Sequence, residues 1–138
     1  MEKNEVKLSF CVWGFSDIGH DEVSAILGVN PSKIFVEGER MNPKFTRLAK
    51  ENGWFIDAPT DRYAPFNEKM DALLDIIESN KEGFESISRK YYCEFSCAIY
   101  IYNDEESTPS VHLGSRYTSV TKTLNIEFDV DLYCSQNS

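Results

Sequence analysis

The feature that most constrains the fold is a long amphipathic segment, which runs from Asn67 to about Tyr91. Apolar residues recur along it at helical spacing, namely Met70, Leu73, Leu74, Ile77, Phe84 and Ile87. The spacing predicts one long helix, with Asn67 as its N-cap residue and Gly83 as a place where it bends. A helix with an apolar stripe of this length has to be covered by a sheet, because no other predicted element is large enough.

The strands of this sheet are predicted by the alternation of apolar and polar residues. Residues 94–102 form the strongest such segment, and residues 124–133 show the cleanest alternation in the chain. Shorter strands are predicted over residues 6–12, 33–37, 54–56 and 111–113. Two short helices are predicted over residues 21–27 and 115–124, and one isolated helical turn is predicted over residues 45–51.

The order of these elements places strands next to one another, without regular alternation of strand and helix. That order is typical of an α+β fold. We expect an antiparallel or mixed sheet of about five to six strands, with one long and two short helices packed mainly on one face. The length of 138 residues suits one domain, and a hydrophobic content of 41% excludes a disordered chain. We therefore predict a single α+β domain over residues 1–138.

Acidic residues outnumber basic ones by 23 to 14, so the net charge is −9. A field of this sign repels phosphate groups and disfavours both nucleic acids and anionic membranes as partners. It favours solubility and a basic protein partner. No apolar run is long enough to span a bilayer, and the first residues lack the apolar core of a signal peptide. We expect a cytoplasmic location, where the four cysteines stay reduced.

No pattern in the sequence predicts catalysis, a cofactor or a metal site. The two histidines, His20 and His112, are too unspecific to indicate a catalytic pair, and we interpret them as structural or exposed. Cys93 and Cys97 would be about 13 Å apart on an extended strand, too far for a shared zinc ion or a disulfide. Cys11 and Cys97 are expected on neighbouring strands as small buried residues. Without a phosphate-binding or calcium-binding loop, the residues favour a binding protein over an enzyme.

Two groups of acidic residues form the candidate partner-binding site. They are Asp104, Glu105 and Glu106 in a predicted loop, and Glu127, Asp129 and Asp131 on the last predicted strand. The three on the strand share one face at about 6.6 Å spacing. Such a row can receive a basic partner or a cation, and it is equally typical of the solvated face of an antiparallel sheet.

A second candidate site lies near the irregular stretch of residues 38–53. Arg40 and Arg47 bring positive charge to it, and Trp54 follows directly. Loops commonly carry ligand-binding residues, so a small-molecule site or an unfamiliar active site is expected here if the protein has one. A surface loop with solvated charges would have the same sequence.

Several of these segments together resemble the bacterial family catalogued as domain of unknown function 4279, from about Leu8 to Tyr133. The markers are the LG-x-x-P turn at Leu27, Gly28 and Pro31, the pair Gly38 and Glu39, Trp54, and the closing D-x-D-L-Y at 129–133. The resemblance implies a small, stand-alone protein, bacterial or phage-borne, without an assigned enzymatic activity. Small acidic proteins of this kind sometimes act as immunity proteins against secreted toxins, which is an analogy of size and fold.

Three functions remain open from the sequence. The first is a protein-binding domain, in its sharpest form an immunity or inhibitor protein that acts on a basic partner. The second is a small-molecule-binding protein or an enzyme, with its site near Arg40–Trp54. The third is a structural homo-oligomer held together by exposed edge strands.

Overall fold

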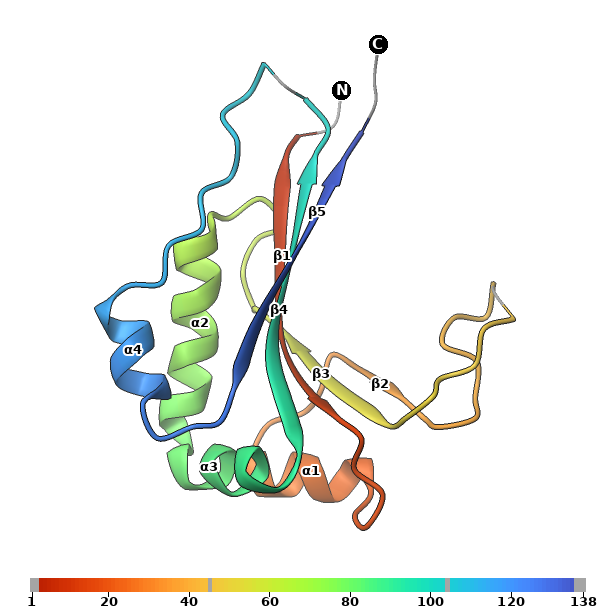
Figure 1. Cartoon of the computed structure of the whole chain (residues 1–138). Helices are drawn as coiled ribbons and strands as arrows, with labels where there is room; N and C mark the ends of the chain where they lie inside the picture. The colour runs from red at the N-terminus through yellow and green to blue at the C-terminus, as the bar shows by residue number, and fades with distance from the viewer. Residues whose placement is uncertain (1–2, 45, 104, 136–138) are drawn as a thin grey trace.

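The structure is a computed structural model, and its described residues are 3–44, 46–103 and 105–135. Figure 1 shows one sheet seen on edge, with helices beside one face and across one end of it. The strands are β1 (Glu5–Trp13), β2 (Lys33–Phe35), β3 (Gly53–Asp57), β4 (Tyr92–Ile101) and β5 (Glu127–Cys134). The helices are α1 (His20–Leu27), α2 (Phe66–Ser79), α3 (Lys81–Lys90) and α4 (Ser115–Thr121).

The five strands form one mixed sheet in the order β2-β3-β1-β4-β5. β1 pairs antiparallel with β3 and β4, and β2 pairs antiparallel with β3, whereas β4 and β5 are parallel. The connection from β4 to β5 passes through α4 on the helix side, which lets the two strands run in the same direction (Figure 1). The predicted α+β class with a mixed sheet is confirmed.

The core lies between the sheet and α2. On β1, Leu8, Phe10 and Val12 belong to this core and are almost fully buried. The Phe10 ring meets the Phe84 ring of α3 edge to face at 5.2 Å, and the Phe95 ring of β4 at 5.9 Å. α2 contributes the apolar stripe that the sequence predicted, Met70, Leu73, Leu74 and Ile77. The alternation along β1 therefore decides which face of the sheet the helices cover.

α4 is connected to α2 by one arginine. Arg116 Nη2 lies 2.5 Å from Asp75 Oδ1 and 2.6 Å from Glu78 Oε1, and Nη1 lies 3.2 Å from Asp71 Oδ1. The three carboxylates are spaced along α2 so that they share one helix face. Because all four side chains are well exposed to solvent, this network orients α4 more than it stabilises the fold.

The predicted long helix is divided into two helices at Asn80, which has φ −152° and ψ 62°. Asn80 Oδ1 accepts a hydrogen bond from the Gly83 N–H at 3.3 Å, and Asn80 Nδ2 donates to the Ile26 carbonyl oxygen at 2.8 Å. Asn80 thus caps α3 and ties it to α1. The expected bend at Gly83 is wrong, since Gly83 serves instead as a contact point where a Cβ would collide with the Ile26 carbonyl oxygen.

Three other predictions from local sequence patterns are wrong or incomplete: a helix start, a short strand and a helical turn. α2 begins directly after Pro65, so Asn67 lies inside its first turn and is not the N-cap residue. The predicted strand at 111–113 does not form, because Val111 packs against the core on the helix side instead of pairing with the sheet. No helical turn forms over the described residues 46–51.

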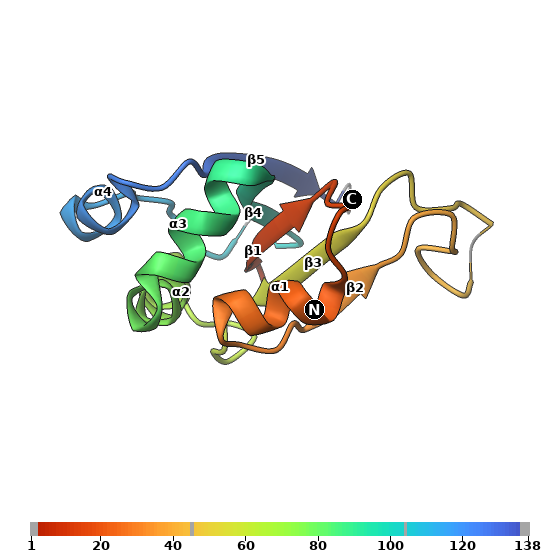
Figure 2. The same cartoon turned by 90° about the horizontal axis from the view of Figure 1, so that it is seen from below.

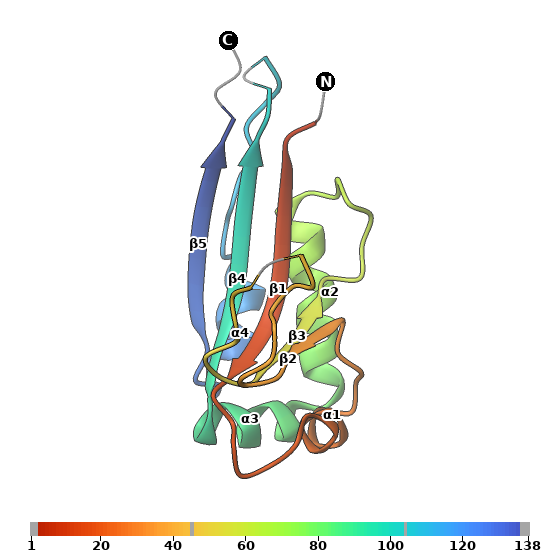
Figure 3. The same ribbon diagram turned by 90° about the vertical axis from the view of Figure 1, so that its right-hand side faces the viewer.

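The face of the sheet opposite the helices is open, and the loop between β2 and β3 projects on this side (Figures 2 and 3). Trp13, Phe35 and Phe55 pack together on this face, with ring centroids 5.0 to 5.7 Å apart. Cys11 has the same strand parity as Trp13 and is fully buried among these residues. Cys97 lies on the neighbouring strand as expected, but on the opposite face of the sheet.

Replacing Asn80 with alanine should lower the free energy of unfolding by about 1–3 kcal/mol, since the change removes a helix cap and the donor to a carbonyl of α1. Urea unfolding measures this difference. The control is Asn67→Ala, at an exposed position that makes no cap, where the expected change is within about 0.5 kcal/mol. Equal losses in the two variants would contradict the role of Asn80.

Candidate functional site

The most exposed strand of the sheet is β5, an edge strand of eight residues. β4 pairs with one side of it, and no strand in the described part of the chain pairs with the other. The backbone N–H and C=O groups on that side are therefore open to a further strand. The edge at the other end of the sheet is β2, which has only three residues. β5 is thus the longer template for pairing with another chain.

The two faces of β5 differ in chemistry. Glu127, Asp129 and Asp131 are exposed in a row on the open face of the sheet. On the helix side, Val130 is 45% exposed and Leu132 is 63% exposed, although both are apolar. The helices cover β5 only near its beginning, as Figure 1 shows. β5 therefore combines a free backbone edge with one acidic and one apolar face.

The acidic row extends onto the neighbouring strand β4, where Glu94 is the register partner of Glu127. Burial raises the pKa of Glu94, and the carboxylates of Asp129 and Asp131 raise it further, against a hydrogen bond with Tyr92 that lowers it. Burial and the hydrogen bond with Glu94 raise the pKa of Tyr92 to about 12. Burial is the largest cause of both pKa shifts, and the smaller part that comes from the neighbouring carboxylates reflects a local negative potential, which a cationic group placed on this face would offset.

Glu105 and Glu106, from the acidic group that was predicted in a loop, follow the end of β4 at Ile101, which is the register partner of Cys134 at the end of β5 (Figure 1). The Glu105 N–H donates to Asn103 Oδ1 at 3.0 Å, and Glu106 Oε1 accepts a hydrogen bond from the Asn4 N–H at 3.2 Å. Asp104 lies outside the described residues. Glu105 and Glu106 are exposed, and they lie past the row on β5 rather than within it.

A cavity of about 380 Å³ opens beside β1 where β3 ends. β3 pairs with β1 only at residues 9–13, so residues 5–8 have no strand on that side. The segment after β3 passes there instead, and its Ala58 N–H donates to the Leu8 carbonyl oxygen at 2.9 Å. The polar and charged residues that line the cavity are Glu5, Lys7, Ser9, Lys33, Asp57, Arg62, Lys69 and Ser96.

Two of these charged residues are buried. Glu5 is 2% exposed, and its carboxylate accepts hydrogen bonds from Arg62 Nη2 at 2.8 Å and from Arg62 Nε at 3.1 Å. Lys69 is 5% exposed, and its Nζ donates to Thr60 Oγ1 and to the Asp61 carbonyl oxygen, both at 3.0 Å. The hydrogen bond from Arg62 lowers the pKa of Glu5, against the effect of burial, whereas burial lowers the pKa of Lys69.

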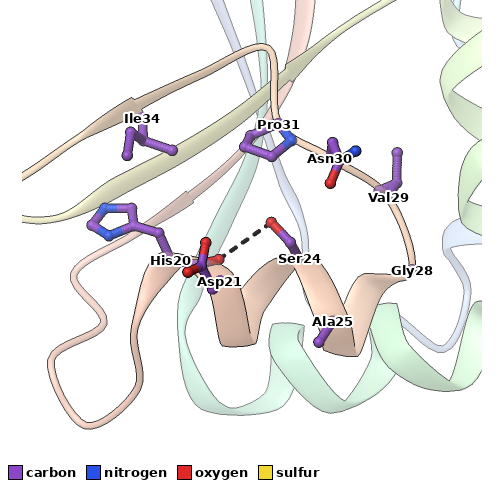
Figure 4. A pocket seen from close by; sticks show the side chains of 9 residues that line it. All are labelled: His20, Asp21, Ser24, Ala25, Gly28, Val29, Asn30, Pro31 and Ile34. Carbon is purple, nitrogen blue, oxygen red and sulfur yellow. Dashed lines mark hydrogen bonds between the residues drawn. The ribbon is translucent and has the colours of Figure 1, made fainter.

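A larger depression, of about 520 Å³, lies between α1 and the turn that follows it (Figure 4). Its lining includes His20, Asp21 and Ser24, which are the residue types of a catalytic triad. His20 Nε2, however, lies 2.8 Å from the Phe35 carbonyl oxygen. Ser24 Oγ donates to the His20 carbonyl oxygen at 3.3 Å and accepts from Trp54 Nε1 at 3.0 Å. The histidine and serine side chains therefore bond to the fold and not to each other, so they form no nucleophile–base pair.

The residues of the second predicted site are not brought together. Arg40 and Arg47 are exposed in the loop between β2 and β3, where Arg40 forms an isolated β-bridge with Leu48. Trp54 is fully buried in the core, and its Nε1 is bonded to Ser24 of α1. The indole ring therefore shares no surface with the two arginines.

Among the described residues, no group of three or more His, Cys, Asp or Glu side chains is arranged to hold a metal ion. The four cysteines are free, and burial raises the pKa of Cys93 to about 12 and that of Cys97 to about 11. These two thiols are therefore poor nucleophiles near neutral pH. None of the helices in the described part of the chain has the length and apolar character needed to cross a bilayer.

Comparison with known proteins identifies one family. The family model described as "Domain of unknown function (DUF4279)" matches residues 4–135. The chain belongs to this family. The resemblance inferred from the sequence is thereby confirmed, and it covers nearly the whole chain. No curated protein and no solved structure matches the chain significantly.

Three of the markers that suggested the DUF4279 family have structural roles in this chain. Gly28 ends α1 with φ 75°, and Gly38 has φ 84° in the loop after β2, both in the left-handed region that favours glycine. Trp54 fills the core. These three markers therefore belong to turns and packing, whereas the closing D-x-D-L-Y at 129–133 is exposed on β5.

The cavity of this DUF4279 domain was not predicted from the sequence. Its buried charges, Glu5 and Lys69, come from the start of a strand and from a helix far away in the chain. One local signal was present, because Lys69 lies one helical turn before Leu73 and therefore on the apolar stripe of α2. A lysine on the buried face of a helix indicates a polar site that the helix covers.

Replacing Glu5 with glutamine should lower the free energy of unfolding by about 1–3 kcal/mol at pH 7, since it removes the buried carboxylate that accepts two hydrogen bonds from Arg62. The lowered pKa of Glu5 means that its contribution is fully present above its ordinary pKa of 4.5 and is lost as the pH falls through the folded-state value. The difference between wild type and variant should therefore shrink below about pH 4.5.

Unfolding curves in urea between pH 7 and pH 3 measure this difference. The control is Glu39→Gln, which removes an exposed carboxylate. Its free energy of unfolding should equal that of the wild type at every pH in this range. A constant difference between wild type and Glu5→Gln across this range would contradict a charged role for Glu5.

Proposed function

We propose that this chain is a protein-binding domain whose edge strand β5 pairs with an extended, basic segment of a partner protein. The free edge of β5 carries the proposal, because an added strand would satisfy the backbone groups that β4 leaves unpaired. An immunity or inhibitor protein that acts on a basic partner is the sharpest form of this function.

The two faces of β5 support a particular chemistry for the partner segment. Lysine or arginine side chains at every second position would lie along Glu127, Asp129 and Asp131. Apolar side chains at the alternate positions would cover Val130 and Leu132. The net charge of −9 would also attract such a partner over distance and increase its association rate.

The same acidic row disfavours pairing of β5 with β5 of a second copy. In an antiparallel pair of identical strands with one common face, the carboxylates of Glu127, Asp129 and Asp131 would oppose one another. Like charges on directly opposite positions destabilise a strand pair. A homo-oligomer is therefore the competing function, and the test below separates it from binding of a basic partner.

The proposal involves no enzymatic step, cofactor, metal ion, nucleic acid or membrane. It places the protein in the cytoplasm, where a reducing environment would keep Cys134, which is exposed and unpaired, as a free thiol. The excess of acidic residues supports a basic protein as the partner, since the same field would repel phosphate groups.

An eight-residue peptide of alternating lysine and valine, matched to β5 in length, tests the proposal. Titration into isotope-labelled protein should produce saturable shifts of backbone amide resonances in β5 and slow the hydrogen exchange of its outward N–H groups. The double variant Asp129→Asn, Asp131→Asn should weaken binding about tenfold, because two charge pairs are lost.

The matched control is Glu37→Gln with Glu39→Gln, which removes the same charge from exposed positions in another loop. Equal weakening in both double variants would show non-specific attraction and would contradict recognition at β5. Light scattering of the free protein adds a further readout. A stable dimer with β5 amides already protected would overturn the proposal in favour of self-association.

A further inference from the structure

The cavity beside β1 concentrates positive charge in an otherwise acidic protein. Its lining holds four cationic side chains against two carboxylates, while the whole chain has a net charge of −9. Both carboxylates already have partners. Glu5 is bonded to Arg62, and Asp57 Oδ1 accepts a hydrogen bond from Ser9 Oγ at 2.6 Å. With four cations and two carboxylates, the lining has a net positive charge.

Lys7 and Lys33 contribute two of these cations, and neither has an ion-pair or hydrogen-bond partner within residues 3–44, 46–103 and 105–135. Lys7 Nζ lies 5.3 Å from the centroid of the Tyr100 ring, and Lys33 Nζ lies 5.0 Å from that of Phe55. These cation–π contacts hold both side chains at the cavity and leave their N–H groups free to donate.

Lys69 is a cation of a different kind, because it is 5% exposed and cannot be fully solvated. Two of the three ammonium protons are donated to Thr60 Oγ1 and to the Asp61 carbonyl oxygen. The third has no acceptor in the part of the chain that the structure describes. A buried ammonium group with an unused donor gains more from an added acceptor than an exposed one does.

The remaining walls of the cavity suit an organic body. The Phe55 and Tyr100 rings and Ala98 supply apolar surface, and the Ser96 hydroxyl has no hydrogen-bond partner among the described residues. The volume of about 380 Å³ lies within the range of roughly 300–1,000 Å³ that is usual for small-molecule sites. Aromatic walls with a few donors that point inward are typical of such sites.

We propose that this cavity binds a small organic anion, namely a carboxylate or a phosphate ester with an aromatic or apolar body. The anionic oxygens would accept hydrogen bonds from Lys69 and from Lys7 or Lys33, and the body would lie against Phe55 and Tyr100. The site is lined by β1 and β4 and by no residue of β5, so this proposal does not rest on protein binding at the free edge of β5.

Nuclear magnetic resonance titrations with phenyl phosphate, phenylacetate and neutral benzyl alcohol test this proposal and separate the two anion types. At least one anion should produce saturable amide shifts that centre on Ser9, Ser96 and Lys69, and benzyl alcohol should produce none. The double variant Lys7→Ala, Lys33→Ala should weaken binding about tenfold or more, because charge-assisted hydrogen bonds are lost. Both lysines are exposed, so the variant should keep its fold.

The control is Lys44→Ala with Lys122→Ala, which makes the same change of net charge at exposed positions outside the cavity. This variant should bind the anion nearly as the wild type does. The proposal is overturned if neither anion produces saturable shifts at the cavity, or if both double variants weaken binding equally. Equal shifts with benzyl alcohol would also overturn it, since they would show an apolar site without anion recognition.

Discussion

The pairing of β1 on both of its sides is the interaction on which the rest of the structure depends. β1 pairs with β4 over nine positions, from Glu5 to Trp13, but with β3 over only five, from Ser9 to Trp13. β4 in turn carries β5 out to the edge of the sheet. The cavity lies where β3 ends beside β1. The free edge belongs to β5, which pairs with the side of β4 that faces away from β1. Both candidate surfaces thus follow from where the partners of β1 begin and end.

Charged side chains lie where β1 lacks a neighbouring strand beside the cavity. Arg62, from the loop that follows β3, bonds the buried Glu5, and Lys69 reaches the same region from α2. These contacts satisfy the buried carboxylate of Glu5 and two of the three N–H groups of Lys69. They also leave cationic donors at a concave surface, which is the physical basis for a ligand site at this place.

The open face of the sheet is divided by charge. Carboxylates gather along β5 and onto β4 at Glu94, and lysines gather along β1 and β2 at Lys7 and Lys33. The aromatic cluster of Trp13, Phe35 and Phe55 covers the sheet near the β2–β3 loop. One face therefore presents an acidic row on β5 and a cationic cavity beside β1, and β4 lies between them.

The sequence by itself determined the features that depend on near neighbours in the chain: the α+β class, the alternation of β4 and β5, the stripe of α2 and the turn at Gly28. Periodicity and capping are local, so a local pattern predicts them. Only the tertiary structure decided the break at Asn80, whose partner Ile26 is 54 positions away, and the meeting of Glu5 with Arg62, 57 positions apart. It also decided that Trp54 fills the core and that Val130 and Leu132 remain exposed. Such outcomes depend on which distant segments pack together, and no local spacing of residues specifies that.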